Sequence, residues 1–424
     1  MDINLYGKDD LGLSDLEIEK GLLDSLKGKQ PKKVLIIPPD ITRLHSKAGF
    51  ITNKYYHLLK NMAEIDILPA LGTHVEMSKE EYSYMFGDIP YNKFLYHDWI
   101  NDVEEIGKVP KEYVNDITDG MWNEYVTIEI NKMIMNNNYD LILSIGQVVP
   151  HEVIGMANHS KNILVGCGGQ KTINESHMIG AVYGMERMMG KDHSPVRKIL
   201  DYGLQHFLKN LPIVFVLTVT TANKDNVYTH GLFIGSKRNI FENAVRESQK
   251  RNIDFIDKPI KKCVVYLDPK EFKSTWLGNK AIYRTRMAIQ DGGELIILGP
   301  GIERFGEAKI IDSLIRKYGY NGRIKTLNAL KDNLELQNNM SAAAHLIHGS
   351  SEDRFKITYA VNGLTENEIK DVNYDYINYN EAVKVYNPDM LTYGWNTLKN
   401  NEEIFYIPNP ALGLWIDEKR FEKK

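Results

Sequence analysis

Six short runs of Val, Ile and Leu constrain the fold of this chain more than any other feature of its sequence. Each run is continuous rather than alternating and is bounded by Gly, Pro or Asp, which suits parallel strands covered by helices on both faces. The runs are 34–37, 65–68, 141–145, 213–219, 264–267 and 295–298. The stretches between them are long enough for helices, as in 241–250, so the sequence predicts an α/β protein.

The chain is long enough for two or three domains, since 424 residues at roughly 150 per domain gives that range. The segment 251–262 is polar, contains a proline and precedes a new strand run, so we place a domain boundary within it. We therefore expect two α/β domains with mainly parallel sheets, comprising residues 1–258 and 259–401. The tail 404–415 is too aromatic for a disordered end, and we expect residues 402–424 to return and complete the first domain.

The charge balance and the cysteine count exclude several classes of protein. Lys and Arg number 52 against 56 Asp and Glu, a net charge of −4, which argues against nucleic-acid binding through bulk positive charge. Cys167 and Cys263 are too few for a disulfide framework or a thiolate zinc site. The first residues have no signal-peptide pattern, and no apolar run approaches the roughly 18 residues of a membrane span. We expect a cytoplasmic protein that binds neither nucleic acid nor membrane.

Polar side chains follow three of the predicted strands at the point where each strand ends. Asp40, Thr42 and Arg43 follow the first run, His74 follows the second and His151 follows the third. Ligands of open α/β sheets bind beyond the carboxyl ends of the strands. Taken singly, these residues have ordinary explanations, such as a helix N-cap, a surface ion pair or a packed histidine. Taken together, they favour a site for acid–base chemistry, because a core needs none of them.

Two further patterns each allow several interpretations. The Gly166-Cys-Gly-Gly stretch could bring backbone N–H groups to a phosphate, but Lys171 stands where a dinucleotide fingerprint needs its last glycine. A nicotinamide-dependent oxidoreductase is therefore an alternative with weak support. His74, His151, His159 and His177 suggest a metal, and imidazole without thiolate suits nickel, copper, iron or zinc. We interpret the other eight histidines as structural, with His97 the least certain.

A set of these motifs resembles the nickel-dependent lactate racemase family over most of the chain. The motifs are Asp40-x-Thr-Arg43, Gly72-Thr-His74, Pro150-His151 with Lys161 ten residues on, and His177. The resemblance implies a racemase or epimerase with an active-site cleft between the two domains, the first binding the cofactor and the second closing over the substrate. It also implies a nickel-pincer nucleotide, a Ni(II)-pyridinium-3,5-bisthiocarboxylic acid mononucleotide, which separate biosynthesis proteins supply.

The resemblance assigns a role to each matching residue. Lys161 matches the lysine that tethers the cofactor, and His177 matches the nickel ligand. His74 and His151 match the paired acid–base histidines, one for each face of the substrate. Lys280, together with Arg43, matches the cations that hold the substrate carboxylate or oxo oxygen. The cofactor-contacting segment comprises Asp40, Ile41, Thr42 and Arg43.

The chain departs from the lactate racemase pattern in two places. Trp276 and Leu277 stand where the family has a Tyr-Gln pair before the lysine, so a hydrogen-bond partner of the substrate is missing and Trp276 becomes the expected substrate contact. Ala157-Asn-His-Ser160 stands where the family has Ser-Gly-Gly before the tether. The opening Pro38-Pro-Asp-Ile-Thr-Arg-Leu-His-Ser-Lys-Ala-Gly49 is more similar to the sugar-acid branch of the superfamily.

We therefore predict inversion at C2 of a 2-hydroxy acid, with a sugar acid favoured, as in 2-epimerisation between D-gluconate and D-mannonate. Polar groups that could bind a polyol tail are His45, Ser46, Lys47, Asn158 and His159. The alternatives are a racemase of lactate or another short 2-hydroxy acid, an NAD(P)-dependent oxidoreductase, and a sugar-acid-binding protein without turnover. The sequence leaves the oligomeric state open, a homo-oligomer included.

Overall fold

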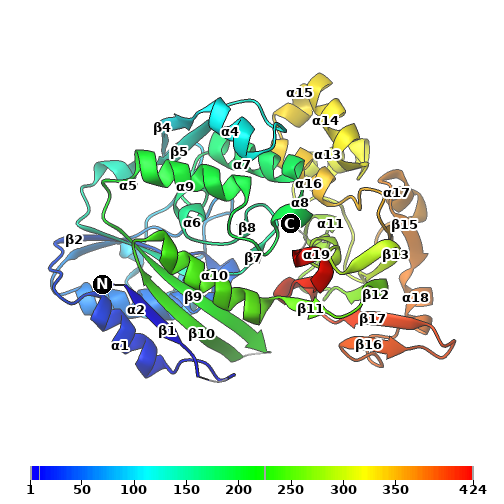
Figure 1. Ribbon diagram of the computed structural model, residues 1–424, viewed down its shortest axis with the longest axis horizontal. Coiled ribbons are helices and arrows are strands. Elements are labelled where there is room, and N and C mark those ends of the chain that lie inside the picture. Colours follow the sequence, from blue (N-terminus) through cyan, green and yellow to red (C-terminus); the bar gives the residue numbers. More distant parts are fainter. Residues whose placement is uncertain (1, 9, 224–225, 423–424) are drawn as a thin grey trace. The chain divides into compact units, whose positions relative to one another are not determined.

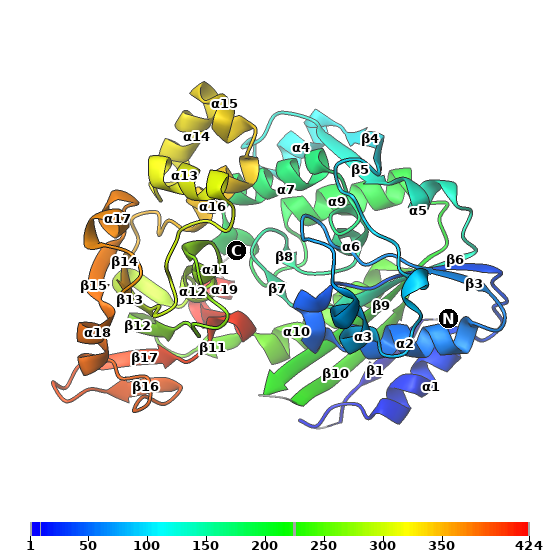
Figure 2. The ribbon, with the colours of Figure 1, turned by 180° about the vertical axis from the view of Figure 1, so that it is seen from behind.

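The computed structural model describes residues 2–8, 10–223 and 226–422. Contacts divide the chain into two compact units, one of Met1–Ile179 with Met188–Asn252 and the other of Gly180–Arg187 with Ile253–Lys424. Within the described residues, none of the helices combines the length and apolar character that a membrane span requires. Figures 1 and 2 show the elements from opposite sides.

The first unit is built on a six-stranded sheet with a small second pairing of β4 and β5. Its strands are β1 (Ile3–Tyr6), β2 (Lys33–Ile37), β3 (Glu64–Ile67), β4 (Val103–Val109), β5 (Val126–Asn131), β6 (Leu141–Gln147), β7 (Pro150–His151), β8 (Gly155–Met156), β9 (Ile213–Asn223) and β10 (Asn226–Gly235). Its helices are α1 (Asp15–Ser25), η1 (Ile41–Ser46), α2 (Ala48–Leu59), α3 (Lys79–Phe86), η2 (Tyr91–Lys93), α4 (Lys111–Ile117), α5 (Lys132–Asn136), α6 (Ser160–Leu164), α9 (Pro195–Phe207) and α10 (Arg238–Asn252). Helices α7 (Gln170–Tyr183) and α8 (Met185–Met188) cross the boundaries between the units.

The first sheet has the order β1-β10-β9-β6-β2-β3, in which β9, β6, β2 and β3 are parallel and β1 and β10 form an antiparallel edge. Helices α1 and α2 cover one face and α10 covers the other (Figures 1 and 2). Ile36 and Leu143 on the sheet pack with Leu22 of α1 and Tyr55 of α2 in one buried core. The first four predicted strand runs are confirmed, because continuous apolar sequence is what a sheet buried on both faces requires.

The second unit contains another mainly parallel sheet, of order β15-β14-β13-β12-β17-β16. Only β16 and β17 pair antiparallel in it. The strands are β11 (Asp254–Ile256), β12 (Ile260–Tyr266), β13 (Ile289–Leu298), β14 (Lys356–Val361), β15 (Asp375–Asn378), β16 (Gly394–Thr397), β17 (Glu403–Ile407) and β18 (Trp415–Asp417). The helices are α11 (Thr275–Gly278), α12 (Lys280–Thr285), α13 (Lys309–Tyr318), α14 (Gly322–Asp332), α15 (Leu334–Gln337), α16 (Met340–His348), α17 (Glu366–Asp371), α18 (Tyr379–Val385), η3 (Pro410–Leu412) and α19 (Glu418–Glu422). The prediction of two α/β units with mainly parallel sheets is confirmed.

The expected domain limits need two corrections. The boundary lies between Asn252 and Ile253 rather than after residue 258, because β11 already pairs with β18 of the second unit. The tail does dock, but residues 402–424 do not complete the first unit. Strand β17 pairs in parallel with β12, and Ile404 and Ile407 are fully buried there. The apolar tail therefore fills a place in the second sheet.

Candidate active site

The loops that follow β6, β2 and β3 begin at one edge of the first sheet. These strands are adjacent and parallel, with β2 in the middle, so their carboxyl ends point the same way. Asp40 precedes η1 after β2, His74 lies in the loop after β3, and His151 ends β7 after β6. The predicted meeting of polar groups is confirmed for Asp40 and His74, whose side chains are hydrogen-bonded.

Asp40 and His74 form a carboxylate–imidazole pair. His74 Nδ1 lies 2.5 Å from Asp40 Oδ2, and Thr42 donates to Asp40 Oδ1 from its backbone N–H at 3.1 Å and its hydroxyl at 2.6 Å. Burial opposes ionisation of Asp40, but the hydrogen bonds from His74 and Thr42 outweigh it and hold the pKa of the carboxyl below its usual value. Because a carboxylate only accepts, the hydrogen of His74 is on Nδ1 and the Nε2 lone pair is left for a substrate. Asp40 is thus both the N-cap of η1 and the partner of a base.

His151 sits at the first corner of the β7–β8 hairpin and is buried. The backbone N–H of Val153 donates to His151 Nδ1 at 3.2 Å. In the neutral ring the hydrogen is therefore on Nε2, which is the opposite tautomer to that of His74. Burial lowers the pKa of His151 well below its usual value, and the cations Lys161 and Arg43 add to this effect.

Lys161 lies on the short helix α6, which is hydrogen-bonded to strands β2 and β6. Asn162 donates from Nδ2 to the carbonyl of Ile37 at 3.2 Å and to the hydroxyl of Ser144 at 3.0 Å, which joins α6 to β2 and β6. Burial, aided by the charge of Arg43, lowers the pKa of Lys161 to about 8. A substantial fraction of the amine is therefore neutral near pH 8, and the neutral amine is the form that bonds to an acyl group.

His177 lies on α7, and its ring orientation is fixed from one turn earlier. Its Nδ1 is 2.6 Å from the carbonyl oxygen of Ile173, which can only accept, so Nδ1 carries the hydrogen. Burial and the charge of Lys161 lower the pKa of His177 to about 4, so the ring is neutral at pH 7. A neutral imidazole with Nδ1–H bonded to a carbonyl presents Nε2 as metal ligands do. His177 thus fits a metal ligand on geometry as well as on sequence.

Arg43 and Ile41 complete the segment after β2. Arg43 is exposed, and its charge contributes to the lowered pKa of both Asp40 and Lys161. The backbone N–H of Ile41 points to Met77 Sδ at 3.1 Å. The predicted cofactor-contacting segment 40–43 is therefore anchored at both Asp40 and Ile41.

The glycine-rich loop 166–169 packs closely against neighbouring backbone, and its interpretation as a phosphate-binding loop is wrong. Its four N–H groups already donate to backbone carbonyls of Lys161, Ile163, Val165 and Glu129. A Cβ on Gly168 would lie 2.0 Å from the carbonyl oxygen of Leu164. His97 also serves this loop, because its Nε2 donates to the Gly168 carbonyl at 3.1 Å while Nδ1 accepts from Asn131 at 3.0 Å. The alternative of a nicotinamide enzyme loses the motif on which it rested.

His159 does not join a metal site. Its ring lies between Phe215 and Phe241, with centroids 4.1 and 5.0 Å away, and its Nδ1 is 3.6 Å from an oxygen of Asp201. In the part of the chain that the structure describes, only Asp192, His193 and Glu242 form a three-residue group with metal-ligand spacing. Arg238 and Arg246 pair with its carboxylates at 3.4 and 3.9 Å, so we interpret this group as an ion-pair cluster.

Trp276 and Lys280 belong to the second unit, on α11 and at the first position of α12. The Trp276 ring stacks on the ring of His345 with centroids 4.2 Å apart. Between them in sequence, Asn279 is fully buried and accepts from Tyr359 Oη at 2.7 Å. These contacts hold the turn that carries Lys280, and nothing in the sequence pattern distinguished His345 or Asn279 beforehand.

Residues 17–189 match the family model of the lactate racemase N-terminal domain. No curated protein matches the chain at a significant level.

Two solved structures share the fold over nearly the whole chain. A protein from Thermotoga maritima is 23% identical with a TM-score of 0.78, and the match covers 97% of this chain and 99% of that one. The lactate racemase apoprotein from Thermoanaerobacterium thermosaccharolyticum is 18% identical with a TM-score of 0.70, and the match covers 98% of this chain and 100% of that one. The fold is therefore that of the lactate racemase apoprotein.

Proposed function

We propose that this protein is a nickel-pincer nucleotide-dependent racemase or epimerase that inverts C2 of a 2-hydroxy acid. The observation that carries the proposal is the pair of strand-end histidines, His74 and His151, whose hydrogen-bond partners fix opposite tautomers. Inversion requires proton transfer on both faces of the substrate, and two histidines of opposite character supply it. The family match of residues 17–189 supports the same class of reaction.

Two residues fit the cofactor. Lys161 offers a partly deprotonated amine for the tether, and His177 offers a neutral Nε2 for nickel. Asp40, Ile41, Thr42 and Arg43 would line it from the loop after β2. When bound, the group accepts a hydride from C2 of the substrate and returns it.

Asp40 prepares His74 to act as a base by fixing its tautomer. As C2 is oxidised, Nε2 of His74 takes the hydroxyl proton, and the imidazolium that forms is stabilised by the Asp40 carboxylate 2.5 Å from Nδ1. His151 is the stronger acid, because burial disfavours its charged form. To return a proton on the opposite face, His151 takes one from solvent and gives one to the oxo oxygen, while the His74 imidazolium loses its proton to solvent, so the proton count of the enzyme is restored. The reverse direction exchanges the two roles.

We propose a sugar acid as the substrate, with lactate or another short 2-hydroxy acid as the alternative. Arg43 would hold the carboxylate or oxo oxygen. His45, two residues after Arg43, is exposed and could contact a polyol tail. Of the other residues named for that tail, Lys47 pairs with Asp15 at 2.8 Å, and Ser46, Asn158 and His159 are buried. The polyol-binding prediction thus rests on His45 alone among them.

The test of the cofactor is the intact mass, under denaturing conditions, of the protein purified from cells that make the pincer nucleotide and from cells that do not. We expect an adduct on Lys161 and nickel in the native sample, and neither in Lys161→Ala. The matched control is Lys171→Ala, since that exposed lysine pairs with Glu129 and Glu105. An unmodified chain, beside a lactate racemase that is loaded in parallel, would refute the proposal.

The test of the reaction is the C2 configuration of the product from gluconate, mannonate, lactate and other 2-hydroxy acids. Inversion of a sugar acid ahead of lactate is the expected result. Thermal stabilisation by these acids without inversion would favour a binding protein. A titration with NAD and NADP that detects tight binding would favour the oxidoreductase instead.

A further inference from the structure

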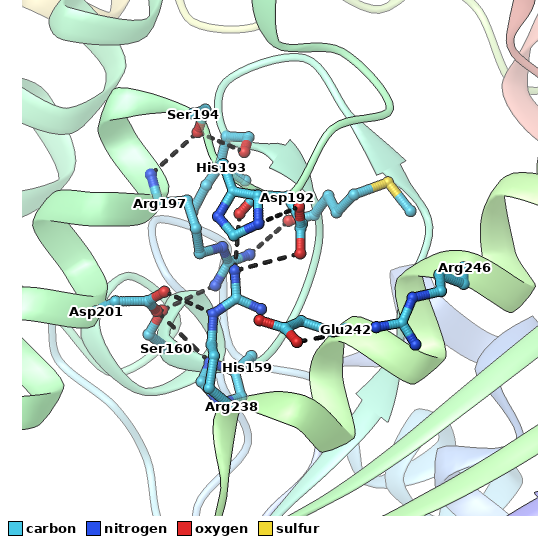
Figure 3. A network of polar contacts seen from close by, with 12 residues as sticks. His159, Ser160, Asp192, His193, Ser194, Arg197, Asp201, Arg238, Glu242 and Arg246 are labelled. Carbon is cyan, nitrogen blue, oxygen red and sulfur yellow. Dashed lines mark hydrogen bonds and ion pairs between the residues drawn. The ribbon is translucent and has the colours of Figure 1, made fainter. Parts of the chain in front are cut away.

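Arg197, in the first turn of α9, is one of the largest side chains in this protein with no exposed surface. Its Nη1 donates to the carbonyl of Asn158 at 3.0 Å and to the hydroxyl of Ser160 at 2.8 Å, and its Nη2 donates to the carbonyl of Met156 at 2.6 Å. Figure 3 shows Arg197 in this network together with Ser160. One planar side chain therefore donates hydrogen bonds to every second residue of the segment 156–160.

Residues near Arg197 at the start of α9 make further hydrogen bonds to both ends of this segment. Ser194, the N-cap of α9, donates from its hydroxyl to the carbonyl of Ile154 at 2.8 Å. Asp201 accepts from the hydroxyl of Ser160 at 2.5 Å and from Arg238 Nε at 3.0 Å (Figure 3). The start of α9 thus holds every second residue from 154 to 160, which is the whole path from the His151 hairpin to the residue before Lys161.

We propose that Arg197 is a positioning residue that, with Asp201, fixes the segment 156–160 and so sets Lys161 relative to His151. The inference rests on the proposed function, since the tether gives the position of Lys161 its purpose.

The backbone conformation of the segment 156–160 explains why these hydrogen bonds are needed. Asn158 and His159 have φ angles of +69° and +58°. Residues other than glycine seldom adopt positive φ angles. A strained backbone persists only where its surroundings determine it several times over. Here the Asn158 carbonyl is held by Arg197, and the Asn158 side chain accepts from the backbone N–H of His159 at 2.7 Å.

The electrostatics also favour a geometric role. Burial lowers the pKa of Arg197 to about 10, so the side chain remains charged at neutral pH although it is out of water. Asp201 is the nearest opposite charge, and it is shared with Arg238. A buried, incompletely paired charge contributes little to stability on balance. A planar donor that reaches three acceptors at once does, however, specify one conformation of the loop.

The test compares Arg197→Met with Arg246→Met, a matched change at an arginine that pairs with Glu242 and bonds to Asn243. Hydrogen exchange is measured on the cofactor-free chain, and adduct on Lys161 is measured by intact mass after expression with the cofactor. For Arg197→Met we expect exchange in 156–160 to be at least 10-fold faster and adduct at least 10-fold lower. Arg246→Met should match the parent. Parental exchange and adduct in a folded Arg197→Met would overturn the proposal.

A second set of variants separates positioning from relief of strain. Replacing both Asn158 and His159 with glycine in the Arg197→Met chain removes the unfavourable φ angles. We expect the Tm to recover and the adduct to stay low, whereas recovery of both would show that Arg197 only offsets strain. If Arg197→Met does not fold, Arg197→Lys is tested by the same measurements, because lysine keeps the charge and loses the planar fork.

The hydrogen-exchange result distinguishes this proposal from the proposed function. A parent chain that never gains an adduct refutes the cofactor, but exchange in the cofactor-free Arg197→Met still decides whether the segment is fixed by Arg197. Lys161→Ala serves as the reference that lacks adduct while keeping parental exchange in 156–160.

Discussion

His74 and His151 carry their ring hydrogens on opposite nitrogens. Asp40 accepts from Nδ1 of His74 at 2.5 Å, whereas Nδ1 of His151 accepts from the backbone N–H of Val153 at 3.2 Å. One Nε2 is consequently a lone pair and the other an N–H before any substrate arrives. The two sides of the proposed reaction are therefore chemically unequal, and this can be tested.

Replacing either histidine should affect the two substrate isomers differently. In a single turnover of loaded enzyme, His74→Gln should slow the formation of 2-oxo acid from one isomer by about 10²-fold or more, and His151→Gln should slow it from the other. Rapid quenching followed by quantification of the oxo acid measures both. Equal slowing of the same isomer by the two variants contradicts the assignment.

Asp40→Asn should reduce turnover without destabilising η1. An amide can hold His74 in the wrong tautomer, so kcat should fall by about 10²-fold or more. Asparagine caps helices as well as aspartate, so the Tm should stay near that of the parent. Asp140→Asn is a suitable control, because Asp140 also accepts backbone N–H groups, from Lys32 and Lys33. Unchanged kcat in Asp40→Asn would exclude a role for the pair in proton transfer.

Stability should decline as the pH falls from about 6.5 to about 4, in part because of His159. Burial lowers the pKa of His159 to about 4, so the unfolded chain binds a proton in this range before the folded chain does. The loss is at most about 3 kcal/mol for one such group. Chemical unfolding of the parent and of His159→Phe across this range measures the effect. The slope against pH should be shallower in the variant, and an identical slope would argue against a neutral buried His159.

The specificity prediction concerns the second unit. Trp276→Tyr combined with Leu277→Gln restores the pair found in lactate racemases, and the glutamine supplies a hydrogen bond worth about 1.5–3 kcal/mol to a charged partner. We expect kcat/KM for lactate to rise about 10-fold or more relative to a sugar acid. Leu277→Met serves as a volume-matched control. No change in the ratio would separate these positions from substrate choice.

The parts of the fold that sequence predicts are those that depend on local pattern. Continuous apolar runs such as 141–145 mark buried parallel strands, and the polar residues after them mark the sheet edge that carries Asp40 and His74. The segment 241–250 likewise lies within α10. These features need no knowledge of what packs against them.

The parts that sequence did not predict depend on partners far along the chain. Arg197 lies between Val196 and Lys198 at the start of a helix, which resembles a solvated face, and its acceptors are backbone groups that no side-chain motif reveals. The sequence alone suggests that His159 is a metal ligand, because its aromatic neighbours, Phe215 and Phe241, are distant in sequence. The position of β17 likewise depends on a distant partner, because it pairs with the edge of β12 that no earlier strand occupies.

The place of β17 in the second sheet also bears on synthesis of the chain. Strand β12 lies between β13 and β17, so one of its edges has no partner until residues 403–407 have left the ribosome. All six strands of the first sheet precede residue 236, and that sheet can form while the rest is still being made. A nascent or truncated chain that stops before β17 exposes the N–H and C=O groups of a strand that is otherwise interior, which is a template for aggregation. Strand β17 thus covers an edge of β12 that the preceding strands of the second sheet leave open.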